Sequence, residues 1–115
     1  MQLNVHDSGL VSVIIPAYNA EDHINEAIDS VVAQTYQNWE LIVVNDGSED
    51  ATESIVRGYT ERDKRICLVN QKNSGPGAAR NNGITRSRGE YIALLDADDI
   101  WFKEKLEKQI TFLQR

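Results

Sequence analysis

The sequence predicts an α/β fold with a mostly parallel, doubly wound (Rossmann-like) sheet and helices on both of its faces. Four short apolar runs alternate with segments whose apolar residues recur at helical spacing, and short polar turns join them. The runs contain so few polar residues that we expect strands covered on both faces, as in parallel sheets. Right-handed crossovers with one reversal give the strand order 3-2-1-4, with a switch point between the first and fourth strands.

The same periodicity places each element along the chain. Pro16 halts the first apolar run because it lacks the N–H that a central strand would use. Asn19, followed three residues later by Asp22, predicts a helix start of the capping-box kind. The expected strands are residues 10–15, 39–44, 66–70 and 91–95, and the expected helices are residues 19–35, a segment that begins near Asp50, residues 76–87 and residues 101–115.

Length, composition and charge narrow the class of protein. A chain of 115 residues forms one domain at most, and 41% hydrophobic residues suit an ordinary globular protein. The net charge of −6 argues against a nucleic-acid partner, because phosphate backbones need a basic face. Residues 1–9 are polar and aperiodic, so we expect a flexible leader before a single domain over residues 10–115.

The sequence also bears on the cellular compartment and on whether the chain is part of a longer protein. It begins with no signal-peptide pattern and has no apolar stretch near the ~20 residues needed to span a bilayer. Cys67, the single cysteine, lies in an apolar run and is predicted to be a buried structural thiol. We therefore expect a soluble cytoplasmic protein, with peripheral membrane association left open. The last helix reaches the final residue without a stop signal, so we expect a truncated domain of a larger protein.

Three carboxylates within four residues follow the last expected strand, at Asp96, Asp98 and Asp99. Carboxylates this close repel one another, so they need a compensating charge or full solvation. A divalent cation is the usual compensator, because Mg²⁺ and Mn²⁺ prefer carboxylate and phosphate oxygens, and ligands bind at strand ends in such sheets. The alternative is a solvated turn in which Asp98 or Asp99 caps the next helix.

Polar residues at the ends of other strands should share this edge of the sheet, and together they match the parts of a nucleotide. Asp46 can accept a hydrogen bond from a base N–H, and Asp96 can accept one from a ribose hydroxyl. Asp98 can hold a metal that bridges two phosphates, with Arg80 as cationic support. Each residue also has a structural explanation, since an aspartate before glycine is common in plain turns. Their expected convergence on one edge of the sheet favours a nucleotide-binding site over unrelated turns.

Four segments resemble, in the same order, the motifs of the family 2 glycosyltransferases. They are VIIPAYN (13–19), VVNDGS (43–48), GPGAARN (75–81) and DADD (96–99), and they cover the chain from about residue 10 to residue 101. One such motif alone would support the resemblance weakly, whereas four motifs in the same order support it strongly. The resemblance implies a GT-A fold that binds a nucleotide-diphosphate sugar, with a UDP-sugar as the expected donor and Mn²⁺ or Mg²⁺ as the cofactor.

The resemblance also implies roles for individual residues. Asp46 would bind the base, often uracil, and Asp96 and Asp98 would form the D-x-D pair at the ribose and the metal, with Asp98 the preferred metal ligand. Arg80 would lie near the base or the diphosphate. The residues that would line the nucleoside pocket are Pro16, Tyr18 and Glu21.

By the same resemblance, the reaction is an inverting transfer in a single step. An acceptor hydroxyl, on a glycan or a lipid-linked molecule, is deprotonated by a carboxylate and displaces the nucleoside diphosphate. In this family the base and the acceptor motifs lie beyond the D-x-D segment, and this chain ends 17 residues after Asp98. We therefore expect the donor half alone, inactive in isolation, with Glu104 and Glu107 on a solvated helix face rather than acting as the base.

The same residues leave three other functions open. A nucleotidyltransferase would carry a glycine-rich, lysine-containing loop after the first strand, where this chain has Pro16-Ala17-Tyr18-Asn19. A receiver-type signalling domain would carry an acidic pair at that place. A non-catalytic binding module remains as the third alternative, and no residue pattern excludes it.

Overall fold

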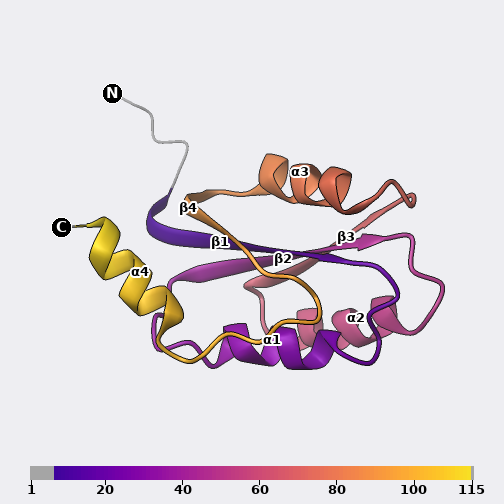
Figure 1. Ribbon diagram of the computed structural model, residues 1–115, viewed down its shortest axis with the longest axis horizontal. Coiled ribbons are helices and arrows are strands. Elements are labelled where there is room, and N and C mark those ends of the chain that lie inside the picture. The colour runs from indigo at the N-terminus through magenta and orange to yellow at the C-terminus, as the bar shows by residue number, and fades with distance from the viewer. Residues whose placement is uncertain (1–6, 115) are drawn as a thin grey trace.

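The structure, a computed structural model, describes residues 7–114 and has four strands and four helices in strict alternation (Figure 1). The sheet forms a middle layer, with α3 on one side and α1 and α2 on the other (Figure 1). In chain order the elements are β1 (Asp7–Ala17), α1 (Ile24–Val32), β2 (Trp39–Asp46), α2 (Thr52–Arg62), β3 (Ile66–Gln71), α3 (Pro76–Arg86), β4 (Gly89–Leu94) and α4 (Lys105–Leu113).

The sheet confirms the predicted topology. Its strands run in the order β3-β2-β1-β4, and all three pairings are parallel. Ile14 at the centre of β1 pairs with Ile42 of β2 and Leu94 of β4, so the switch point lies between β1 and β4. The carboxyl ends of all four strands therefore meet at one edge, where an α/β sheet binds its ligands.

Two apolar layers hold the helices to the sheet. The larger layer joins α1, α2 and α4 to one face, and the smaller one joins α3 to the other face through Ala79. A Cβ atom at Gly83 would lie 2.6 Å from Cγ2 of Ile14, so this glycine lets α3 pack closely on β1. The small residues Ala79 and Gly83 thus allow α3 to approach the sheet closely.

The outer strands differ from the fully covered strands that the sequence suggested. Ile92 and Leu94 of β4 are 46% and 49% exposed, while alternate residues of that strand pack against the core. Cys67 on β3, at the opposite edge of the sheet, is exposed, so the prediction of a buried thiol is wrong. Loss of part of its hydration still raises the pKa of that thiol, and the Glu40 carboxylate adds to the effect. An edge strand lacks a neighbour on one side, which leaves part of one face open.

The first strand and the first helix begin at other residues than predicted. β1 begins at Asp7, three residues before the expected strand, and the rest of the expected leader, residues 1–6, lies outside the described residues. Asn19 does not cap a helix, because α1 begins at Ile24 after a turn and Asn19 has a φ of 48°. Among residues 7–114, no helix is long and apolar enough to cross a membrane.

Candidate functional site

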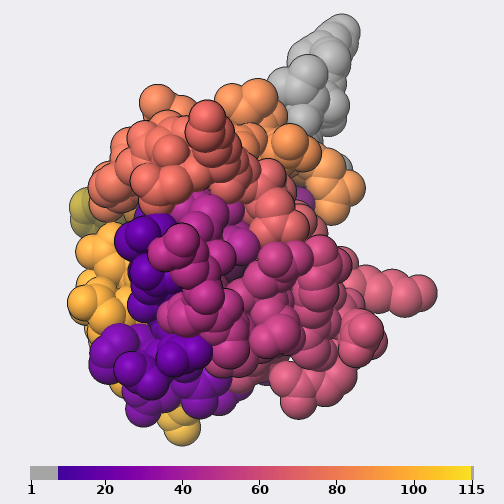
Figure 2. Space-filling view, turned by 90° about the vertical axis from the view of Figure 1, so that its right-hand side faces the viewer, coloured from indigo at the N-terminus to yellow at the C-terminus, as the bar shows by residue number. Residues whose placement is uncertain are grey.

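The loops that follow β1, β2 and β4 lie side by side at the carboxyl edge of the sheet. Figure 2 looks onto this edge, with the indigo loop after β1 between the magenta loop after β2 and the orange segment after β4, and α3 above them. Parallel pairing explains the arrangement, since Ala17 at the end of β1 pairs with Asn45 near the end of β2. The predicted site residues are therefore brought to one surface.

A set of reciprocal hydrogen bonds, here called the loop clasp, joins the loop after β1 to the loop after β2. Main-chain N–H groups of each loop donate to side-chain oxygens of the other, which holds the two loops together. The bonds run from Asn19 N to Ser48 Oγ (2.9 Å), Glu49 N to Asn19 Oδ1 (2.8 Å), Ala20 N to Thr52 Oγ1 (2.8 Å), Glu21 N to Asp50 Oδ2 (3.2 Å) and Ala51 N to Glu21 Oε1 (2.9 Å).

The loop clasp decides where two sequence-predicted residues lie. The side chain of Glu21 is engaged with the Ala51 N–H and is absent from the lining of the two cavities described below. Asn19, expected to cap α1, instead uses its left-handed backbone and its carboxamide oxygen to hold the second loop. The role of Glu21 in a nucleoside pocket stays a prediction.

Asp46 is buried at the end of β2, with 3% of its surface exposed. Its Oδ1 accepts hydrogen bonds from Gln71 Nε2 (2.9 Å) and Ser74 N (2.7 Å), and its Oδ2 accepts one from Gly75 N (3.0 Å). Burial alone would raise the pKa of Asp46, but these donors outweigh it and hold the pKa below the ordinary aspartate value. The carboxylate is thus charged at neutral pH and organises the turn before α3.

A cavity of about 430 Å³, the Asp46 cavity, opens beside this carboxylate. Its walls come from the end of β1 and from the turn between β3 and α3, and the Tyr18 ring, 51% exposed, stands at its edge. The lining residues are Pro16, Ala17, Tyr18, Asp46, Asn73, Gly75, Pro76 and Ala79. Mostly apolar walls with one buried carboxylate suit a flat heterocycle that carries an N–H donor.

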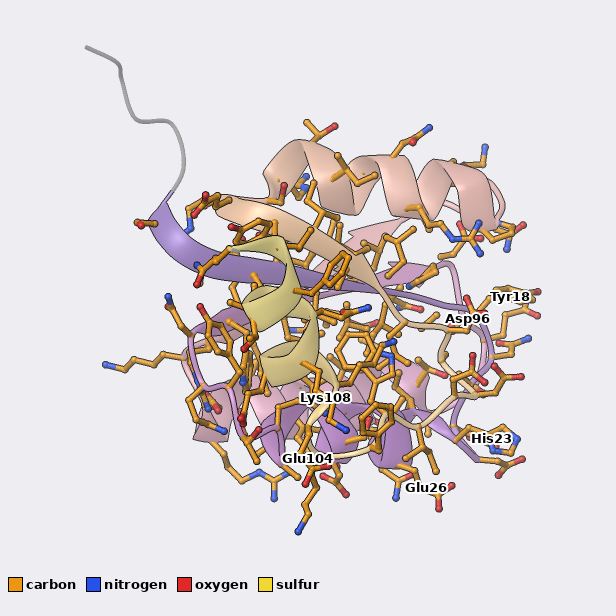
Figure 3. All side chains as sticks on the ribbon, turned by 60° about the vertical axis from the view of Figure 1, so that its left-hand side comes forward. Tyr18, His23, Glu26, Asp96, Glu104 and Lys108 are labelled. Atoms are coloured by element: carbon orange, nitrogen blue, oxygen red, sulfur yellow. The ribbon has the colours of Figure 1, made fainter. Side chains whose placement is uncertain are left out.

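A second cavity of about 290 Å³, the Asp96 cavity, adjoins the first, because Pro16, Tyr18 and Pro76 line both. Its far side is formed by the segment after β4, and the start of α1 contributes His23. In Figure 3, Tyr18 and Asp96 lie together at one end of the sheet, with His23 below them. Tyr18 therefore stands between a buried carboxylate and an exposed acidic turn.

The acidic turn, residues 96–99, brings three carboxylates together. Oxygens of Asp96, Asp98 and Asp99 all lie within 4.8 Å of one another, and all three side chains are exposed. A hard divalent ion such as Mg²⁺ or Mn²⁺ suits an all-oxygen ligand set that leaves room for water and phosphate oxygens. The residues therefore fit the predicted cofactor, with Asp99 as a further candidate ligand beyond the predicted pair.

Arg80 faces this turn from the first turns of α3. Its Nη2 lies 3.5 Å from Oδ1 of Asp96, and both side chains are partly exposed. Arg80 also lines the Asp96 cavity and an adjacent hollow of about 520 Å³ on the side of Trp101. One guanidinium thus supplies positive charge beside three carboxylates, in a position to share an anionic ligand with a bound cation.

Sequence reasoning missed several residues of this surface. Asn73 and Gly75 line the Asp46 cavity, and His23 lines the Asp96 cavity. The glycine-rich turn before Pro76 was a visible signal for the first two, whereas His23 had none, because its place depends on the turn that precedes α1. Glu104 lies well away from Asp96 in Figure 3, and Glu107 accepts a hydrogen bond from Thr35, so neither contributes to the cavities.

Comparison with known proteins gives the family of the chain. The model of glycosyl transferase family 2 matches residues 12–115. The putative teichuronic acid biosynthesis glycosyltransferase TuaG of Bacillus subtilis is 48% identical over 105 residues, which are 90% of this chain and 42% of TuaG. Glycosyltransferase GlyA of Streptococcus pneumoniae is 43% identical over 108 residues, 90% of this chain and 15% of GlyA. The chain thus spans less than half the length of these relatives.

Solved structures with the same fold include complexes with nucleotide sugars. S. aureus TarS in complex with UDP-GlcNAc has a TM-score of 0.84 and 36% identity, over 90% of this chain and 31% of that one. The mannosyltransferase PcManGT from Pyrobaculum calidifontis, in complex with GDP-Man and Mn²⁺, has a TM-score of 0.74 and 33% identity, over 79% of this chain and 28% of that one. With its α/β sheet and its four motifs in order, the chain belongs to glycosyl transferase family 2.

Proposed function

We propose that the chain is the donor-binding half of an inverting, metal-dependent glycosyltransferase that uses a UDP-sugar. The observation that carries the proposal is the shared wall of Pro16, Tyr18 and Pro76, which joins the Asp46 cavity to the Asp96 cavity. A nucleoside diphosphate has its base and its phosphates at opposite ends. The two adjoining cavities offer a buried carboxylate for the base and an acidic turn with Arg80 for the diphosphate.

The hydrogen bonds of Asp46 favour uracil over guanine. A carboxylate has about four acceptor positions, and Gln71, Ser74 and Gly75 occupy three of them. One position on Oδ2 is left, which matches the single imide N–H of uracil. Guanine offers two adjacent donors, which a carboxylate accepts best with both oxygens. Complexes of the related TarS with UDP and UDP-GlcNAc support the same preference.

The remaining parts of the donor are assigned by charge. Asp96 would accept a hydrogen bond from a ribose hydroxyl, and Asp98, with Asp96, would hold Mn²⁺ or Mg²⁺. When bound, such an ion offsets the charge that develops on the departing diphosphate. Arg80 would bind a diphosphate oxygen, and Tyr18 would cover the nucleoside. The Mn²⁺ complex of PcManGT supports a metal-bound donor in this fold.

The acceptor side of the reaction is assigned to the larger protein. In an inverting transfer, the acceptor hydroxyl loses its proton to a carboxylate base and attacks the sugar carbon, while the diphosphate leaves from the opposite face. Relatives such as TuaG are more than twice as long as this chain. We assign the base and the site for a glycan or lipid-linked acceptor to that additional length, in a protein of polysaccharide or glycan biosynthesis that works on the cytoplasmic side.

Calorimetric titration of the chain with UDP, in EDTA and in Mn²⁺, tests this function. We expect Mn²⁺ to strengthen UDP binding at least tenfold, because it adds phosphate contacts, and the substitution Asp98→Ala to remove that gain. Asp22→Ala, which removes an exposed carboxylate outside the acidic turn, is the matched control and should leave the gain intact. A folded chain that binds UDP equally with and without metal, or binds GDP more tightly than UDP, would contradict the proposal.

A further inference from the structure

Gln34, just beyond the end of α1, is buried and fully hydrogen bonded. Its side chain is among the largest in the molecule with under 2% exposure, at 1%. Nε2 donates to Ser30 O (3.1 Å) and to Phe102 O (2.8 Å), and Oε1 accepts from Leu106 N (3.0 Å). One carboxamide thus joins α1 to a segment that lies 68 to 72 residues away in sequence.

That segment is the connection from the acidic turn to α4. Leu95 N donates to Ile14 O (3.0 Å), which fixes the chain just before the acidic turn. After the turn, Gln34 holds Phe102 and Leu106, and Thr35 N donates to Lys103 O (3.0 Å). The acidic turn is therefore a short span between an anchor on β1 and an anchor on the end of α1.

The two anchors have different physical characters. The anchor on β1 continues the hydrogen bonding of the sheet, whereas the anchor beyond α1 combines the main-chain bond from Thr35 with the buried carboxamide of Gln34. Trp101 also packs against the core, but an apolar contact fixes no register along the chain. The carboxamide of Gln34 does, because one amide nitrogen and one oxygen must each meet a specific main-chain group. Its loss would leave the Leu106 N–H buried without this partner.

We propose that Gln34 is a positioning residue for the metal-binding turn. It contacts no nucleotide-facing residue, and it acts by setting where residues 96–99 lie relative to the Asp46 cavity. The inference rests on the proposed function for the identity of the ligand, but the connection itself does not. A positioned turn presents its three carboxylates already clustered, which lowers the entropic cost of binding an ion.

The test compares the wild-type chain with Gln34→Met, which keeps the length and apolar bulk of the side chain and removes its amide. Gln37→Met is the matched control, because Gln37 is an exposed glutamine whose partners are Val32, Gln34 and Arg65. Three quantities are measured: uridine affinity in EDTA, the gain in UDP affinity from Mn²⁺, and amide hydrogen exchange over residues 99–106. The exchange rates require no ligand.

We expect Gln34→Met to leave uridine affinity unchanged, to cut the Mn²⁺ gain about tenfold and to speed exchange over residues 99–106 by a similar factor. Gln37→Met should match the wild type in all three. A folded Gln34→Met chain with wild-type exchange and Mn²⁺ gain would overturn the inference, and so would equal losses of uridine and Mn²⁺-dependent affinity, since these indicate a general structural role.

The experiment remains decisive in two other cases: a Gln34→Met chain that does not fold, and a wild-type chain that shows no Mn²⁺ gain. If Gln34→Met does not fold, Gln34→Leu asks the same question, because it also removes the amide, fills the buried site with apolar bulk and introduces no charge. If the wild-type chain shows no Mn²⁺ gain, the proposed function fails. The exchange measurement then still decides the positioning role, with fast exchange in Gln34→Met alone supporting it and unchanged exchange overturning it.

Discussion

The two ends of the candidate site are both built on aspartate, yet they differ in almost every physical respect. Asp46 is 3% exposed and receives one hydrogen bond from Gln71 at the end of β3 and two from the turn before α3. The side chain of Asp96 is 58% exposed and meets one guanidinium at 3.5 Å, and Asp98 and Asp99 are exposed beside it. Hydrogen bonds formed within the fold stabilise the charge of Asp46, whereas the carboxylates of the acidic turn remain exposed and available to a ligand.

The difference shows how one sheet edge can combine rigidity with ligand dependence. The hydrogen bonds of Asp46 form on folding and need no ligand. In the proposed function, the cavity would therefore select a base by its shape and by the acceptor position that remains on Asp46. Carboxylates that repel one another gain most from a cation, so in the proposed function a bound ion would stabilise the acidic turn. The free energy of unfolding should therefore depend mainly on Asp46, and the metal-dependent affinity for UDP mainly on the acidic turn.

Replacing one aspartate by alanine at each end of the site should give the largest difference in the free energy of unfolding between the two regions. We expect Asp46→Ala to lower the free energy of unfolding by about 3 kcal/mol, because it removes a buried carboxylate and leaves the partly buried donors of Ser74, Gly75 and Gln71 without their partner. Asp98→Ala should change it by less than about 0.5 kcal/mol, because that carboxylate is exposed. Urea unfolding of both variants measures the contrast, and equal losses would break it.

Acid should reduce the contribution that Asp46 makes to the stability of the fold. Burial opposes the charge of Asp46, but the hydrogen bonds from Gln71, Ser74 and Gly75 prevail and set its folded pKa below the ordinary value. A lowered folded pKa contributes stability that is fully present above the unfolded pKa of about 4 and is lost as the pH falls through the folded pKa.

The matched variant for this effect is Asp46→Asn, which keeps the shape of the side chain and removes its charge. We expect it to cost about 2 kcal/mol at pH 7, because the Asn amide would face the N–H of Gly75 or Ser74. The deficit relative to the wild type should shrink as the pH is lowered from 5 to below 4. Urea midpoints at several pH values measure it, and a deficit that stays constant would contradict the assignment.

The sequence predicted the strand order and the convergence of Asp46, Asp96 and Asp98 because both follow from chain-wide patterns. Alternating periodicities specify a parallel sheet, and a parallel sheet brings every strand end to one edge. The structure confirms that order. Features set by a neighbouring segment were not accessible in this way. The exposure of Cys67 and Leu94 depends on which strands lie at the edges, and a short apolar run looks the same in either place.

Local side-chain chemistry was the least predictable part of the site. Asn19 has the residue type of a helix cap, but its partner is Glu49 N in another loop, so tertiary contact overrides a local preference. Gln34 gave no signal at all, since a glutamine near a helix end is usually solvated and its distant partners are main-chain groups of Phe102 and Leu106. Such contacts become visible only once the loops are placed.

Arg80 allows the smallest effect to be assigned to one end, because it lies beside the acidic turn, does not line the Asp46 cavity and contributes little to folding. Its pair with Asp96 is long and partly exposed, so Arg80→Gln should change the free energy of unfolding by less than about 0.5 kcal/mol. The same variant should weaken UDP binding about tenfold and leave uridine binding unchanged, since only UDP carries the diphosphate. Arg86→Gln, at the other end of α3, is the control and should affect neither ligand. At 1 M salt, where charges are screened beyond about 3 Å, the UDP difference between Arg80→Gln and the wild type should narrow, and a loss of uridine affinity instead would move Arg80 from the diphosphate to the base.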